Sequence, residues 1–187
     1  IVLGKDALKA KTEYTATNTN VATAIGQLQA ADCDVVFGFM IPGFTALALG
    51  TSAQLGFKAQ WVISSVGADP VALAGYLKKN KALSEGLIAG NYMPSLADKD
   101  NSWVKMFTEI HEQYGEDVPL DYTTLHGYML AYAVTQALVS AGDDLTREGI
   151  VKALEEGIAD GPSPTPYAYS ADDHSGMTGV YVSKIEN

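Results

Sequence analysis

The sequence predicts an α/β protein in which helices cover both faces of a parallel sheet, a three-layer αβα arrangement. Two observations carry this prediction. Short apolar runs alternate with helix-like segments through the first half of the chain, and Gly or Pro residues punctuate the alternation. Strands that alternate with helices in this way form parallel βαβ units with right-handed crossovers. The 187 residues are enough for one large domain or two small lobes.

The first half of the chain supplies the strands. The first predicted helix begins near Asn20, where apolar residues recur three and four positions apart. Residues 34–41 form a continuous apolar run and predict a strand buried on both faces. Residues 44–55 predict a helix that ends at Gly56. A strand at 60–64 and a loop at 65–68 are predicted next. The helix that follows is capped by Asp69 and has Pro70 in its first turn. A lysine-rich surface turn at 78–81 then leads to a strand at 87–93.

The second half of the chain predicts mostly helix. Helices are expected over 103–114, 121–141 and 146–154, each followed by a glycine, and a last strand over 179–183. Residues 122–142 lack Asp, Glu, Lys and Arg, which raises the question of a membrane span. Their Thr, His, Gln and Ser residues favour a buried helix of a soluble domain instead.

Composition excludes several classes of function. Twelve Lys and Arg against 22 Asp and Glu give a net charge of −10, which argues against nucleic acid and against anionic membrane surfaces as partners. The single cysteine, Cys33, excludes an internal disulfide and is expected to be a structural thiol. With one Cys and three His residues, no metal site is predicted. No glycine-rich dinucleotide or phosphate motif follows a predicted strand, so no cofactor is expected.

The predicted sheet directs attention to two loops. Ligands of open parallel sheets bind outside the carboxyl ends of the strands, here residues 40–44 and 64–69. Ser65 stands where a hydrolase would carry its nucleophile, but Ile63 replaces the first glycine of that motif. Hydroxyls that line a loop are the favoured interpretation. The acidic cluster Asp172, Asp173 and His174 predicts a solvated turn. The residues alone therefore indicate a soluble α/β protein with a pocket at its strand ends, and no enzyme.

Several segments, in order, resemble one family. Residues 14–20, 25–36 and 48–61 resemble the second lobe of branched-chain amino acid ABC-transporter substrate-binding proteins. Residues 127–128, 137–142, 145–154 and 170–176 extend the resemblance over nearly the whole chain. It implies a type I periplasmic-binding fold, with two α/β lobes that close on a solute by a hinge motion.

The resemblance also implies how the chain divides. Residues 1–88 are expected to form the second lobe, residues 89–175 the mainly helical part of the first lobe, and residues 176–187 a strand that returns to the second lobe. Family members are about twice as long, so the chain resembles their C-terminal half, and the first-lobe sheet is expected before Ile1. A chain of this kind is expected to be poorly stable alone or to self-associate through exposed apolar surface.

The function that the resemblance implies is solute binding for an ABC importer. The ligand is expected to be an amino acid or a small organic acid, the partner an ABC permease, and the location periplasmic or extracellular, with a lipid anchor at the cell surface as one form. Six residues are candidates for ligand binding: Ile41, Pro42, Ser64, Ser65, Asp69 and Tyr92. The alternatives are the ligand-binding domain of a sensor with the same fold and an α/β hydrolase that uses Ser65.

Ligand specificity depends on three of these positions. Leucine-binding members of the family place a carboxylate and an aromatic residue where Ser65 and Ile41 stand in this sequence. A buried ammonium group without a counter-charge is costly, so a zwitterionic ligand requires Asp69 to replace the carboxylate. Asp69 is expected to cap a helix instead. Acids without an amine therefore suit this sequence at least as well as amino acids.

Overall fold

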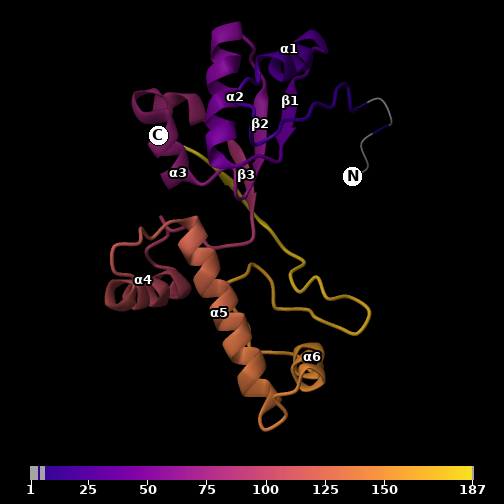
Figure 1. Cartoon of the computed structure of the whole chain (residues 1–187), viewed down its shortest axis with the longest axis vertical. Helices are drawn as coiled ribbons and strands as arrows, with labels where there is room; N and C mark the ends of the chain where they lie inside the picture. The colour runs from indigo at the N-terminus through magenta and orange to yellow at the C-terminus, as the bar shows by residue number, and fades with distance from the viewer. Residues whose placement is uncertain (1–3, 5–6, 187) are drawn as a thin grey trace. The chain divides into compact units, whose positions relative to one another are not determined.

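The computed structural model describes residue 4 and residues 7–186 of the chain. It divides into two compact units, drawn in Figure 1: unit 1 is Ile1–Gly90 with Val182–Asn187, and unit 2 is Asn91–Tyr181. Each unit has its own hydrophobic core.

Among the described residues, the sheet contains four strands in the order β1-β2-β3-β4. They are β1 (Val35–Gly38), β2 (Gln60–Ser64), β3 (Ile88–Asn91) and β4 (Tyr181–Lys184). β1 is parallel to β2 and β2 is parallel to β3, with Phe37 opposite Val62 and Val62 opposite Ile88. The predicted α/β class with a parallel sheet is confirmed, and β2 has the bounds that the sequence predicts.

Three α-helices and one 3-10 helix accompany these strands in unit 1: α1 (Ala22–Ala30), α2 (Pro42–Leu55), α3 (Pro70–Leu77) and η1 (Lys78–Ser84). α2 begins two residues earlier than predicted, because Pro42 fits the first turn of a helix. Gly56 ends α2 with φ of 68°, a left-handed conformation that glycine adopts without steric cost. The lysine-rich surface turn is the 3-10 helix η1.

The core of unit 1 lies between the helices and one face of the sheet. Trp61, Ile63 and Ala89 point to this face and are at most 7% exposed. α2 contacts both α1 and α3, which is expected when successive right-handed crossovers place their helices on the same face. Cys33 is half-buried and packs against this core, as a structural thiol should.

The opposite face of the sheet is open in the described part of the chain. Val35 is 46% exposed and Phe37 is 63% exposed, and both alternate with buried residues along β1. The prediction of a strand buried on both faces is therefore wrong for β1. The apolar run indicated two covered faces, but the described helices that flank β1 in sequence pack on the other face only. We call Val35, Phe37, Val62 and Ile88 the open face.

Unit 2 contains three helices: α4 (Ser102–Tyr114), α5 (Tyr122–Ala141) and α6 (Arg147–Glu156). Each agrees with its predicted bounds to within two residues. The side chains of Asn101, Asp121 and Thr146 each accept a backbone N–H of the helix that follows and so cap it. The core of unit 2 combines aromatic residues with Leu and Met and contains Phe107, Leu125 and Met129.

Much of α5 faces solvent. Leu130, Val134 and Val139 are 51%, 58% and 70% exposed, so the prediction of a buried helix is wrong for this face of α5. The opposite face is buried, as Leu125 and Met129 show. Among the described helices, none has the length and apolar character needed to cross a membrane.

Candidate functional site

The connection from β1 to α2 forms the first side of the candidate site. Its central residue is Ile41, whose carbonyl oxygen accepts the N–H groups of Phe44 at 2.9 Å and of Thr45 at 3.0 Å. The hydroxyl of Thr45 donates to the same carbonyl at 3.4 Å. The carbonyl of Ile41 is thus held by the first turn of α2, while the Ile41 side chain remains 47% exposed.

The connection from β2 to α3 forms the second side. The carbonyl of Ser64 accepts the N–H of Ala68 at 3.1 Å, which closes a tight turn. Asp69 then begins α3, and its Oδ1 accepts the N–H groups of Val71 at 2.9 Å and Ala72 at 3.1 Å. Asp69 is only 4% exposed. The predicted N-cap role of Asp69 is confirmed.

Gly67 brings the two connections into contact. A Cβ on Gly67 would overlap the carbonyl oxygen of Met40 and would lie 3.0 Å from Oγ1 of Thr45. Only a residue without a side chain allows the second connection to lie so close to the first. The carboxyl ends of β1 and β2 therefore form one continuous surface in unit 1.

The structure brings five of the six candidate binding residues to this edge of unit 1. Ile41 is exposed, Pro42, Ser64 and Ser65 are half-buried, and Asp69 is buried. Tyr92 belongs to unit 2, where its ring makes an edge contact with His126 at a centroid distance of 5.6 Å. A ligand role for these six residues stays a prediction.

Tyr14 is a part of this edge that the sequence did not reveal. The Tyr14 hydroxyl accepts the N–H of Ile41 at 3.3 Å, and the Tyr14 ring lies 4.4 Å from that of Phe44. The contact joins residues 27 positions apart in the chain. No motif signals such a pairing, because Tyr14 precedes the first helix and belongs to neither loop.

Two other arrangements that the sequence suggested are a hydrolase nucleophile at Ser65 and the acidic cluster of Asp172, Asp173 and His174. All three histidines of the chain lie between residues 91 and 181, so Ser65 has no imidazole base within its own unit. Asp173 lies in an exposed turn and accepts the N–H of Ser175 at 2.8 Å. This Ser175 contact holds the pKa of Asp173 below its ordinary value. His174 contacts Glu155 at 2.9 Å. The predicted solvated turn is confirmed.

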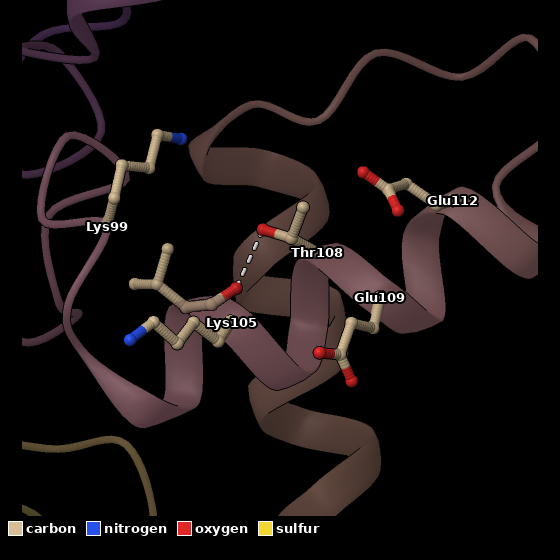
Figure 2. Close-up of a pocket in the computed structure, with 6 residues that line it drawn as sticks. Lys99, Lys105, Thr108, Glu109 and Glu112 are labelled. Carbon is tan, nitrogen blue, oxygen red and sulfur yellow. Dashed lines mark hydrogen bonds between the residues drawn. The ribbon is translucent and has the colours of Figure 1, made fainter.

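A shallow hollow beside α4 is a further surface feature of unit 2. It is lined by Lys99, Val104, Lys105, Thr108, Glu109 and Glu112. Figure 2 shows the lysines on one side and the glutamates on the other, so their charged ends do not converge. The Thr108 hydroxyl is occupied by a hydrogen bond to the Val104 carbonyl at 2.7 Å. Within residues 4 and 7–186, no cluster of His, Cys, Asp and Glu could hold a metal ion.

Comparison with known proteins identifies the family of this fold. The sequence model of the family described as periplasmic binding protein matches residues 4–187. A comparison with curated protein sequences finds no match.

Solved structures share the fold. A fatty acid ABC transporter substrate-binding protein from Thermomonospora curvata is 25% identical with a TM-score of 0.77, over 92% of this chain and 44% of that chain. A possible leucine/isoleucine/valine-binding protein from Rhodopirellula baltica SH 1 is 21% identical with a TM-score of 0.76, over 90% of this chain and 45% of that chain. A branched chain amino acid ABC transporter from Thermus thermophilus, solved with bound valine, is 16% identical with a TM-score of 0.75, over 94% of this chain and 48% of that chain. The chain thus spans less than half the length of each of these three structures.

Proposed function

The chain belongs to the periplasmic binding protein family, and from this premise we propose that it is part of the solute-binding component of an ABC importer. The observation that carries the proposal is the edge of unit 1, where Gly67 joins the ends of β1 and β2 into one surface. This surface presents two exposed aliphatic side chains, Ile41 and Val66, beside the hydroxyls of Ser64 and Ser65. It is suited to a small ligand with an apolar part and a hydrogen-bonding group.

The ligand that fits this edge best is a small carboxylic acid without an amine. Asp69 is the acidic residue of the two connections, and its Oδ1 already accepts two N–H groups of α3. Drawing Asp69 toward a ligand ammonium would leave those donors without their cap. Ser64 and Ser65 can donate hydrogen bonds to a carboxylate. A fatty acid transporter protein is among the solved structures that share the fold, which supports this ligand class.

Membership of the family supports a proposed arrangement of the whole protein. We assign residues 1–88 to the second lobe, residues 89–175 to the first lobe and residues 176–187 to the returning strand. The edge of unit 1 holds the ligand, Tyr92 is a further candidate contact in unit 2, and the protein delivers the ligand to an ABC permease from the periplasm or the extracellular side. It binds and releases its ligand unchanged.

Calorimetric titration of the whole protein that contains this chain tests the proposal. The probes are octanoate, leucine and valine. We expect octanoate to give a binding isotherm and a raised melting temperature, with weaker effects for the two amino acids. No heat and no thermal shift for any probe would contradict the proposed function.

Two serine variants test whether octanoate binds at the edge of unit 1. Ser65→Ala removes one hydroxyl of the candidate site and should weaken octanoate binding by about 3- to 10-fold, the usual value of one hydrogen bond. The control is Ser140→Ala on α5, since Ser140 is an exposed serine of unit 2. Turnover of an acyl ester that Ser65→Ala abolishes would indicate a hydrolase instead.

A further inference from the structure

We propose that Tyr14 is a positioning residue of the ligand site, which fixes the backbone of Ile41 so that its side chain is presented to the ligand. The ligand part of this inference rests on the proposed function. The contact itself is a property of unit 1 and can be tested without any ligand.

The backbone of Ile41 needs a partner that regular structure does not supply. β1 ends at Gly38 and α2 begins at Pro42, so Ile41 lies in the extended connection between them, with φ of −87° and ψ of 157°. Its carbonyl is held by α2. Its N–H donates to the hydroxyl of Tyr14 at 3.3 Å. Both polar groups of the Ile41 backbone are therefore satisfied, the carbonyl by the first turn of α2 and the N–H by Tyr14.

The Tyr14 hydroxyl is held in place by the packing of its ring. The ring lies 4.4 Å from that of Phe44, tilted by 32°, and Phe44 is only 6% exposed. Tyr14 is half-buried and packs against the core of unit 1. An aromatic ring packed on a buried neighbour keeps few rotamers, so the hydroxyl is pre-organised to accept the Ile41 N–H.

Removal of the Tyr14 hydroxyl alone tests the positioning of the Ile41 backbone separately from the packing of the Tyr14 ring. Tyr14→Phe keeps the ring on Phe44 and leaves the Ile41 N–H to water. Global stability should change little, because Ile41 is exposed and water can replace the lost acceptor. The Ile41 connection should become more mobile, and a ligand then has to order it on binding, which lowers affinity.

The experiment compares Tyr14→Phe with Tyr132→Phe in the whole protein that contains this chain. Tyr132 is a matched control, because its hydroxyl also bonds to a backbone group, the carbonyl of Asp160 at 3.1 Å, within unit 2. Amide hydrogen exchange at Ile41 is measured by NMR, and octanoate and leucine are titrated into each variant. We expect exchange at Ile41 at least 10-fold faster in Tyr14→Phe and unchanged in Tyr132→Phe. Octanoate affinity should fall 3- to 10-fold in Tyr14→Phe alone, and the ratio of octanoate to leucine affinity should change with it.

Three outcomes overturn the proposal. The first is unchanged exchange at Ile41 in Tyr14→Phe, which would show that the hydroxyl does not hold this N–H. The second is faster exchange with unchanged affinity and selectivity, which would limit Tyr14 to a structural role. The third is an equal loss of affinity in Tyr132→Phe. Wild-type protein that binds neither octanoate nor leucine contradicts the proposed function. In that case the Ile41 exchange rate still supports or overturns the hydrogen bond between Tyr14 and Ile41.

Discussion

Gly67 packs against the carbonyl oxygen of Met40 so closely that a Cβ at position 67 would overlap it. This one contact connects the residues after β2 with the residues after β1. The two sides of the candidate site therefore move together, and a substitution at Gly67 changes both.

Gly67→Ala should separate the two connections. The added methyl meets the Met40 backbone, which cannot rotate away as a flexible side chain can. Overpacking of this kind costs about 1–3 kcal/mol of unfolding free energy. Urea unfolding measures the loss, and octanoate titration should show weaker binding.

The control for this prediction is Gly26→Ala in α1, where nothing lies within 4 Å of an added Cβ. Alanine favours a helix over glycine by up to about 1 kcal/mol, so Gly26→Ala should stabilise the chain. A Gly67→Ala chain as stable as Gly26→Ala would show that the two connections are not in contact.

Asp69→Ala should destabilise unit 1 by about 0.5–2 kcal/mol, because it removes the acceptor for two N–H groups at the start of α3. Asp69→Asn keeps a capping oxygen and should retain most of that stability. Thermal melts of both variants measure the difference. If Asp69→Asn retains its stability but loses leucine binding, Asp69 is a ligand counter-charge and our choice of ligand class is wrong.

The open face, together with Phe39 just after β1, should drive self-association of the chain. Phe37 is 63% exposed and Phe39 is 83% exposed, beside the free edge of β1 in the described sheet. Exposed apolar strands at a sheet edge recruit other chains. We expect sedimentation velocity to show oligomers that Phe37→Ser with Phe39→Ser reduces. Val118→Ser with Leu145→Ser is the control, since both side chains are exposed and apolar but lie outside the described sheet. A monodisperse wild-type monomer with one sharp melting transition would contradict the prediction.

Tyr167 should make the chain sensitive to alkali. Burial raises the pKa of Tyr167 from 10.0 to about 12, with smaller contributions from Tyr169 and Tyr132. The unfolded chain ionises this hydroxyl first, so its contribution to stability is complete below pH 10 and is lost as the pH rises toward 12. In Tyr167→Phe this part of the loss should disappear. Urea unfolding from pH 9 to 11.5 tests the difference.

The stability of Tyr167→Phe at neutral pH is the control for this prediction. The Tyr167 hydroxyl is buried with no hydrogen-bond partner among the described residues. Removing an unsatisfied polar group costs nothing in lost bonds, so Tyr167→Phe should be at least as stable as wild type at pH 7. A marked loss of stability at pH 7 would mean that the hydroxyl has a partner.

Local signals in the sequence were enough to predict most elements. The Asp69-Pro70 pair marks the start of α3, and Gly56 marks the end of α2, because each residue type has a specific role at a helix end. Burial was harder to predict. Phe37 and Val134 lie in apolar segments that look covered, yet coverage depends on which other elements pack on that face.

The same distinction applies to the candidate site. The carboxyl ends of parallel strands predict where Ile41 and Ser65 should meet, and the structure brings their connections together through Gly67. Tyr14 could not be predicted, because a hydrogen bond across 27 positions depends on tertiary packing and leaves no periodic pattern.

The pairing of β3 with the segment that contains β4 forms late, because β4 is translated after nearly all of unit 2. The N–H of Ile185 donates to the carbonyl of Leu87 at 2.9 Å, and the carbonyl of Ile185 accepts the N–H of Gly86 at 2.9 Å. The whole of unit 2 is translated between these partners. On the ribosome, unit 1 therefore keeps β3 unpaired on one side until residues 181–185 emerge. Its folding includes a late, long-range step, and a nascent chain stalled before Tyr181 presents that strand edge to chaperones.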